Sequence, residues 1–276
     1  MEDAATWLGQ LPSELAAQQR MLQQLLDWCE GDEDVRWLTV GCSLERGNAD
    51  RLSDLDVAIG VREEHFVEAL ARVRQALGHL GELVEAYDYL MPLSFPLRRF
   101  FAQYQDRTQV DLTVGFAPVV NLPRAVVLYD PEGAVRVASD EALDAKPDEV
   151  RVWACQAWEA LTSVGKYVRR SSYWEAVDQL HEARANLFRL WALAERVPEA
   201  RYGITALVDA GAGLPPGIDK SGPGASVGEV LTAARYLAGM LIGLQHLLSS
   251  DERYELPHEF GAWVAADLAQ ALYGDR

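Results

Sequence analysis

The spacing of apolar residues changes near the middle of the chain. In the first half, short apolar or alternating runs predict strands at 35–40, 54–60, 83–89, 97–104, 110–116 and 125–129. Between them, apolar residues at helical spacing predict helices over 13–28 and 63–80. The first half is therefore expected to form a mixed α and β domain.

From Pro147 onward the spacing predicts helices without strands, over 149–170, 173–195, 227–248 and 258–272. A polar stretch at 139–148 separates the two patterns, and the Gly- and Pro-rich run 211–224 is expected to be a loop within the helical part. We therefore expect an α+β protein. Its N-terminal domain, residues 1–145, would hold a mixed β-sheet with flanking helices, and residues 146–276 would form an α-helical bundle.

The charge balance indicates which kinds of molecule the protein would bind. Among 276 residues, 42 are acidic and 25 are basic, which gives a formal net charge of −17. Nucleic-acid binding depends on basic groups that neutralise phosphates, so no nucleic-acid partner is expected. A cationic small molecule would instead be attracted, although solubility alone also favours an acidic surface. No apolar run long enough to span a membrane and no secretion signal are seen, so we expect a cytoplasmic protein without a membrane partner.

Two aspartates stand out within an apolar segment. Asp54 and Asp56 are two residues apart in a predicted strand, so their carboxylates would share one face while Leu55 and Val57 pack behind them. Adjacent carboxylates favour a hard cation such as Mg²⁺, which takes one or two protein carboxylates and completes its octahedron with water and phosphate oxygens. The pair therefore indicates a candidate phosphoryl or nucleotidyl transfer site.

Two further features accompany this pair. The small-residue turn Gly41-Cys42-Ser43 follows a predicted strand, and if a helix begins at Ser43 its backbone amides would favour a phosphate. Asp111 interrupts a later apolar strand, where burial of an unpaired acid would be costly. One alternative is that Asp111 lies on an edge strand and faces solvent. The order of the turn, the aspartate pair and the third acid favours a shared site.

The segment Gly41-Cys42-Ser43-Leu44-Glu45-Arg46-Gly47, followed by Ser53-Asp54-Leu55-Asp56-Val57, resembles the signature of the DNA polymerase beta-like nucleotidyltransferase superfamily. A catalytic domain followed by a helical bundle in a chain of this size is similar to the antibiotic nucleotidyltransferases, such as the streptomycin, kanamycin and lincosamide adenylyltransferases. The motif covers residues 40–60 and Asp111, whereas the bundle matches in kind and length. Cys42 is a departure, because many members carry a second glycine there.

The resemblance implies roles for these residues. Asp54 and Asp56 would hold Mg²⁺ on the phosphates of ATP, and Gly41 and Ser43 would contact the β and γ phosphates. Asp111 would complete the triad, either as a ligand of a second metal ion or as the general base for the attacking hydroxyl. The implied reaction transfers AMP to a hydroxyl of a small, cationic acceptor such as an aminoglycoside, and releases pyrophosphate.

Two basic residues have two interpretations each. Lys166 is one of three lysines and lies in a predicted helix with Arg169 and Arg170. It would either reach the triphosphate or complement the dipole at the end of its helix. Arg46 would either touch phosphate or anchor its loop through a local salt bridge.

Candidate acceptor-binding acids lie in the helical half. Glu159, Asp178 and Glu182 are accompanied by Trp158 and by the aromatic pair 173–174, and acids beside aromatic rings suit an aminated sugar. The alternative is the usual bundle pattern, with tryptophan in the core and glutamate outside.

The sequence leaves two other classes of function open. The first is an antitoxin-like or regulatory protein that acts on a partner protein, and the second is an inactive copy of the fold. The length and the second domain weigh against the first, and the presence of all three acids weighs against the second. The sequence does not indicate an oligomeric state.

Overall fold

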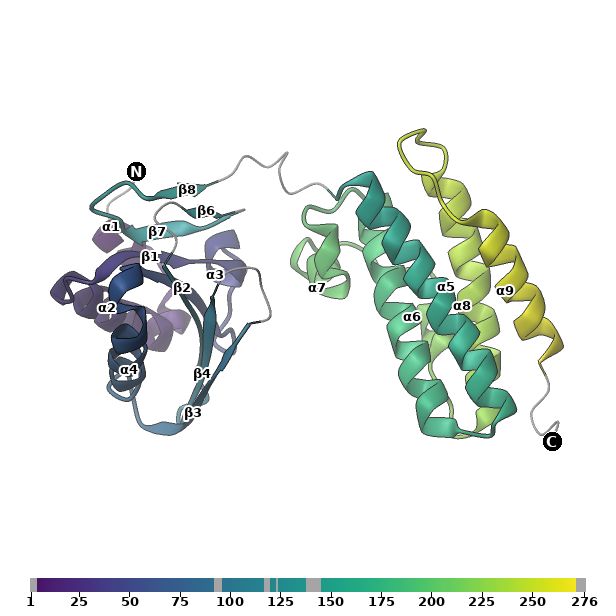
Figure 1. The fold of residues 1–276 in the computed structure, drawn as a ribbon, viewed down its shortest axis with the longest axis horizontal. Coiled ribbons are helices and arrows are strands. Elements are labelled where there is room, and N and C mark those ends of the chain that lie inside the picture. The colour runs from purple at the N-terminus through teal and green to yellow at the C-terminus, as the bar shows by residue number, and fades with distance from the viewer. Residues whose placement is uncertain (1–3, 92–95, 117–119, 123, 138–144, 272–276) are drawn as a thin grey trace. The chain divides into compact units, whose positions relative to one another are not determined.

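The computed structural model describes residues 4–91, 96–116, 120–122, 124–137 and 145–271. The chain divides into two compact units, Met1–Ala142 and Leu143–Arg276 (Figure 1). The first contains strands and helices and the second contains helices, so the predicted α+β class is confirmed. The polar stretch predicted to separate the domains, 139–148, lies largely outside the described residues.

The N-terminal unit contains every strand and helix that the apolar spacing predicts there, within a few residues. Four short elements, α1, α3, β6 and β8, are additional, because they are too short to show a period. The elements are α1 (Ala4–Gly9), α2 (Ala16–Gly31), β1 (Val35–Val40), α3 (Cys42–Arg46), β2 (Leu55–Val61), α4 (Phe66–Leu77), β3 (Leu83–Leu90), β4 (Arg98–Tyr104), β5 (Gln109–Gly115), β6 (Val120–Leu122), β7 (Val126–Tyr129) and β8 (Val135–Val137).

Six of these strands form one mixed sheet in the order β3-β4-β5-β2-β1-β7. Strands β2 and β5 are parallel, and the other neighbouring pairs are antiparallel. Strands β6 and β8 form a separate parallel pair. Because β5 lies between β4 and β2, the alternative that places Asp111 on an edge strand is wrong.

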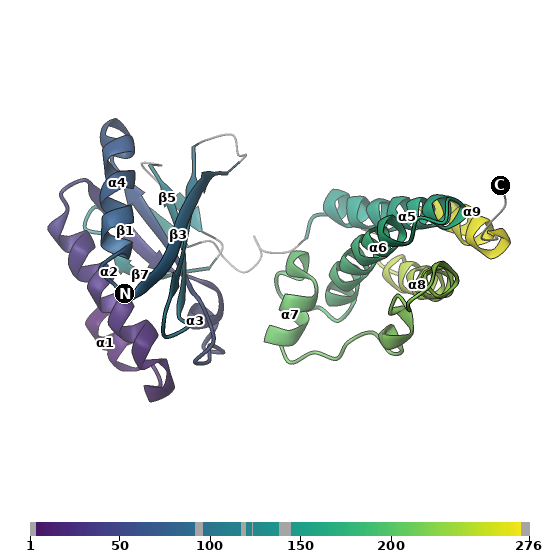
Figure 2. The same cartoon turned by 90° about the horizontal axis from the view of Figure 1, so that it is seen from below.

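One face of the large sheet is covered by helices and the other carries the acidic residues. Helices α2 and α4 lie against the same face in Figure 2, and their apolar residues share a core with those of the strands. Leu55, Val57 and Ile59 of β2 are buried in this core. Burial of each such side chain contributes about 1.5–3 kcal/mol. Since side chains alternate along a strand, this packing turns Asp56 to the opposite face, here called the open face.

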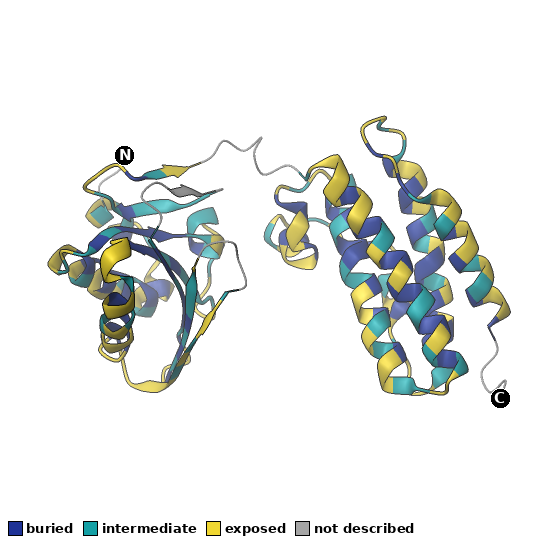
Figure 3. Ribbon diagram, in the orientation of Figure 1, coloured by how far each residue is buried: buried dark blue, intermediate teal, exposed yellow. Residues whose placement is uncertain are grey.

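The C-terminal unit is a bundle of long helices (Figure 1), and all four predicted helices form. Its helices are α5 (Pro147–Arg169), α6 (Tyr173–Ala194), α7 (Ile204–Asp209), α8 (Val227–Leu248) and α9 (His258–Gln270). Buried residues follow the inner side of the long helices in Figure 3. Among the described helices, α8 is long and apolar enough to cross a membrane by length and composition, as core helices of soluble proteins also are, and its apolar side chains pack in the bundle core.

Candidate active site

The open face of the sheet brings Asp56 and Asp111 side by side. The two residues are register partners on the parallel strands β2 and β5, whose backbones are roughly 4.8 Å apart. Asp54 immediately precedes β2 and is half-buried. The structure therefore places two of the predicted site residues next to each other and the third beside them.

This crowding changes the acidity of Asp56. The pKa of Asp56 is raised from 3.8 to about 6, first by burial, then by the charge of Asp54 and, more weakly, by that of Asp111. A hydrogen bond from the Cys42 thiol and the charge of Arg99 act in the opposite direction. The ionised form of Asp56 is thus short of positive charge, which is the condition in which a carboxylate attracts a cation.

Arg99, which the sequence pattern does not identify, holds Asp111. Its Nε donates to Oδ1 of Asp111 at 2.7 Å, its Nη2 donates to Oδ2, and its Nη1 donates to the hydroxyl of Tyr89 at 3.1 Å. The Asp111 residue is only 9% exposed, so this bidentate partner compensates the burial of its charge. Each carboxylate oxygen accepts one hydrogen bond from Arg99 and keeps a second lone pair, so Asp111 can still accept a proton or bind a metal ion while Arg99 holds it.

The turn before the aspartates is held to the same strand. The backbone N–H of Gly41 donates to the carbonyl oxygen of Asp56 at 2.9 Å, and helix α3 begins at Cys42. A Cβ atom at Gly41 would meet no other atom within 4 Å, so the space beside this backbone is open. Ser43 lies in the first turn of α3, so the condition set out from the sequence, a helix that begins near Ser43, is met.

Cys42 links this turn to Asp56 through its side chain. Its φ of 56° lies in the left-handed region, which is where the family pattern has glycine. Cys42 is an exposed residue, but desolvation of its thiol by the surrounding atoms, followed by the charge of Asp56, raises the pKa of that thiol to about 12. The thiol therefore stays protonated at neutral pH and donates its hydrogen to Asp56. Its spacing in the sequence gives no sign of this role.

A buried glutamine positions the loop that leads to Asp54. Gln18 of α2 is 1% exposed, and its Nε2 donates to the carbonyl of Ser53 at 3.0 Å. Gln18 stands at helical spacing between Leu15 and Leu22, on the apolar side of its helix. A polar residue on that side is the sequence signal for such a contact.

The two basic candidates are in different units. Arg46 ends α3, and its charge lowers the pKa of Cys42, so it lies close to the aspartates. Lys166 is in the last turn of α5, with its Nζ 4.4 Å from the centre of the Tyr167 ring. A role of either residue in binding phosphate stays a prediction.

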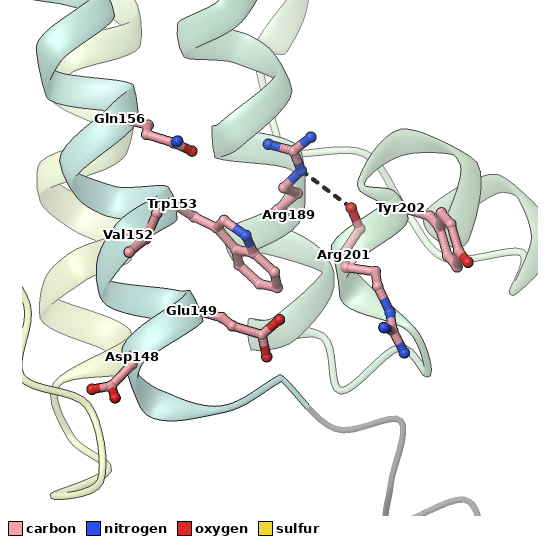
Figure 4. Close-up of a pocket in the computed structure, with 8 residues that line it drawn as sticks. All are labelled: Asp148, Glu149, Val152, Trp153, Gln156, Arg189, Arg201 and Tyr202. Atoms are coloured by element: carbon pink, nitrogen blue, oxygen red, sulfur yellow. Dashed lines mark hydrogen bonds between the residues drawn. The ribbon is translucent and has the colours of Figure 1, made fainter. Parts of the chain in front are cut away.

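Two of the three predicted acceptor-binding acids line one cavity in the helical unit. Its volume is about 330 Å³, and its lining comprises Gln156, Glu159, Ala160, Gln179, Glu182, Asn186 and Arg189. Asp178 is not among these residues. A larger cavity of about 700 Å³ shares Gln156 and Arg189 with it, and Trp153 and Tyr202 also line this second cavity (Figure 4).

The aromatic neighbours expected around those acids lie elsewhere. Trp158 is fully buried, and its indole ring packs against Gly261 in the bundle core, so its expected place beside the acceptor is wrong. Tyr173 donates its hydroxyl to the carbonyl of Gly224, and Trp174 is 78% exposed. Neither of these two lines either cavity.

The donor set of the open face fits one magnesium ion. Within the described ranges, no group of three or more His, Cys, Asp or Glu side chains is arranged to hold a metal ion. Asp54 and Asp56 alone suffice for Mg²⁺, because the remaining ligands come from water and substrate phosphates. Burial and the charge of Asp54 raise the pKa of Asp56, so a cation bound by the pair would favour its ionised form.

No family model and no curated protein matches the sequence. Three of the solved structures with a similar fold are an aminoglycoside 6-adenyltransferase from Bacillus subtilis, a nucleotidyltransferase-like protein from Exiguobacterium sibiricum, and terminal uridylyl transferase 4 from Trypanosoma brucei with bound CTP. The first is 15% identical over 90% of this chain and 96% of its own, with a TM-score of 0.42. The second is 10% identical over 94% and 80% (TM-score 0.32), and the third is 13% identical over 87% and 67% (TM-score 0.28).

With TM-scores below 0.5, the function has to be inferred from the chain's own residues.

Proposed function

We propose that this chain is a nucleotidyltransferase that transfers AMP from ATP, with Mg²⁺, to a hydroxyl of a small cationic acceptor such as an aminoglycoside. The observation that carries the proposal is the placement of Asp56 beside Asp111 on the open face, with Asp54 next to them. The turn at Gly41 is hydrogen-bonded to the same strand and leaves space for a phosphate. A cytoplasmic location, where ATP is available, is part of the proposal.

The proposed reaction forms one bond and breaks one. The acceptor oxygen bonds to the α-phosphorus of ATP, the bond from that phosphorus to the bridging oxygen breaks, and pyrophosphate leaves. The hydroxyl proton passes to a carboxylate within hydrogen-bond reach, for which Asp111 or an acid of the helical unit is the candidate. Mg²⁺, when bound by Asp54 and Asp56, would neutralise charge on the phosphate oxygens.

The acceptor is proposed to be cationic for two reasons. The net charge of −17 attracts positively charged molecules. The cavity lined by Glu159 and Glu182 has a volume of about 330 Å³, which is within the range of small-molecule sites. We propose that these two acids, from α5 and α6, bind amino groups of the acceptor; Asp178 is on α6 with Glu182 but outside the lining of the cavity.

The proposal is tested by offering purified protein, Mg²⁺ and labelled ATP a panel of aminoglycosides and lincosamides. Mass spectrometry of the acceptors is expected to show addition of AMP, and parallel reactions with the other nucleoside triphosphates would show the donor preference. If no acceptor in the panel is modified, the antibiotic assignment is wrong. Modification or stoichiometric copurification of a partner protein would favour the regulatory alternative.

A further inference from the structure

The open face carries an exposed aromatic surface in line with the aspartates. It consists of Tyr87 and Tyr89 of β3 and Phe101 of β4, here called the aromatic ledge. Tyr87 is the register partner of Phe101, Phe101 is the partner of Asp111, and Asp111 is the partner of Asp56. One row across four strands therefore leads from the ledge to the aspartates, over a backbone distance of roughly 14 Å.

The rings of the ledge are close together and accessible within their unit. Tyr87 is 53% exposed and Tyr89 is 40% exposed. The ring centres of Tyr87 and Tyr89 are 6.4 Å apart with an interplanar angle of 20°, and those of Tyr87 and Phe101 are 5.5 Å apart. Grouped rings on an open sheet face are costly to leave in water, and such a patch indicates a binding surface.

The polar groups of these strands are distributed against the usual pattern. Asp88 of β3 points to the helix-covered face, where Arg98 of β4 and Arg74 of α4 pair with it and its side chain is 5% exposed. The aromatic side chains occupy the uncovered face, together with Glu85 and Arg99. Charged residues at exposed positions are enough to protect a sheet edge, so solubility does not account for the three rings.

The ledge is also joined to the site by hydrogen bonds. Arg99, which holds both carboxylate oxygens of Asp111, donates to the hydroxyl of Tyr89 at 3.1 Å. A molecule that rests on the ledge would therefore contact Tyr89, which is hydrogen-bonded to Arg99, the partner of Asp111.

The in-line geometry of the proposed reaction indicates which of the two substrates lies over the ledge. In an in-line displacement, the attacking hydroxyl approaches opposite the leaving pyrophosphate. The turn that would hold the pyrophosphate part of ATP joins β1 to α3, on one side of Asp56, whereas Asp111 and the ledge lie on the other side. The acceptor, and not the nucleotide, would then lie over β5, β4 and β3.

We propose that the aromatic ledge is the surface of the N-terminal unit that binds the acceptor, in addition to the acids of the helical unit, and that it takes a ring bearing protonated amino groups. This inference rests on the proposed function. The faces of Tyr and Phe rings attract cations, and Glu85 adds a carboxylate two residues before Tyr87 on the same face of β3. The net charge of −17 acts in the same direction.

The test measures binding of a cationic probe, kanamycin, and of ATP with Mg²⁺ separately, by calorimetry. Tyr87→Ala and Tyr87→Leu are expected to weaken kanamycin binding roughly 3- to 30-fold, and Tyr87→Phe to retain most of it. The Kd for ATP should stay within about twofold. Leu90→Ala is the matched control, because Leu90 is on the same strand, similarly exposed at 57%, and two residues from Asp88, on the other face.

Each outcome decides a different claim. Unchanged kanamycin affinity in both Tyr87 variants, an equal loss for ATP, or no kanamycin binding to the unaltered protein would overturn the ledge proposal. A dimer in sedimentation that Tyr87→Ala dissociates would overturn it in favour of an interface between copies. Ledge-dependent binding without AMP transfer would overturn the proposed function and leave the ledge intact. AMP transfer with unchanged acceptor affinity in Tyr87→Ala would overturn the ledge proposal and leave the proposed function intact.

Discussion

The open face of the sheet and the polar cavity of the bundle both carry acids, but the acids are placed differently. On the sheet, Asp56 lies beside Asp111 and near Asp54, and burial, followed by the charge of Asp54, raises the pKa of Asp56 to about 6. In the cavity, Glu159 and Glu182 are set among amide side chains and Arg189. Crowded carboxylates favour binding of a metal ion, whereas dispersed acids among amides favour recognition of a polar ligand. The two regions should therefore respond differently to the loss of one charge.

The largest effect is expected for Asp56→Asn. If Asp56 holds the metal, kcat should fall by roughly three orders of magnitude, since metal binding contributes several kcal/mol at the transition state. The free energy of unfolding at pH 7 should stay the same or rise, because a carboxylate with a raised pKa is removed. Steady-state kinetics and urea unfolding measure the two quantities.

The control for this variant is Asp27→Asn, on the exposed side of α2, where an asparagine can still accept the hydrogen bond from Gln23. It should change neither quantity. Near-normal turnover in Asp56→Asn would remove the distinction between the two regions, because the crowded acids would then have no part in the chemistry.

The second effect concerns Arg99, the positively charged side chain that pairs with Asp111 on the sheet. Arg99→Met leaves Asp111, whose side chain is 11% exposed, without its bidentate partner. We expect the free energy of unfolding at pH 7 to fall by about 2 kcal/mol, which is below the cost of fully buried pairs because Arg99 itself is 41% exposed.

Urea unfolding checks this prediction, with Arg20→Met as the comparison. Arg20 pairs with Asp106 at 3.5 Å on the surface, where both side chains are about half exposed, and its loss should cost less than about 1 kcal/mol. Equal losses in the two variants would show that Asp111 does not depend on Arg99 for its charge.

Arg99 also marks the limit of what the sequence could predict. The apolar spacing placed the strands, and the motif led to Asp54, Asp56 and Asp111 because side chains two apart on a strand share a face. The contact between Arg99 and Asp111 depends on the register of β4 against β5, which alternation within each strand does not specify. The same holds for the row that links Tyr87 to Asp111.

The helical unit shows a second limit. Its long helices have clear periods and were predicted well, but helical spacing alone did not distinguish the core from a cavity wall. Trp158 and Glu159 are adjacent in the sequence, yet one is fully buried and the other lines a cavity. Which residue faces a neighbouring helix depends on how the helices are rotated against each other, and this follows from packing of the whole bundle.

The third effect concerns the acids of the cavity in the helical unit and tests whether they bind the acceptor. The double variant Glu159→Gln and Glu182→Gln keeps the shape of both side chains and removes two negative charges. We expect KM for an aminated acceptor to rise about tenfold, as for the loss of one or two charge-assisted contacts, while kcat stays within about twofold. Glu175→Gln, on the same helix α6 and outside the cavity lining, is the control.

A fall in kcat with unchanged KM in that double variant would place one of these glutamates in the chemistry. It would then be the stronger candidate for general base, and Asp111 would be left with a structural role. Unchanged kcat and KM would mean that the cavity does not bind the acceptor.

The smallest effect concerns the acidity of Asp56 in the metal-free protein. Because its pKa in the folded state is about 6 and the ordinary value is 3.8, its contribution to stability is full below pH 3.8 and is lost as pH rises through 6. Asp54 is the main charged cause of the shift, so Asp54→Asn should lower the pKa toward the ordinary value. At pH 6 the ionised fraction would then rise about twofold, from half to nearly all. Carboxyl carbon NMR in the presence of a chelator follows this titration directly, and a pKa that stays near 6 in Asp54→Asn would show that burial alone sets the acidity, without the crowding that distinguishes the sheet from the bundle.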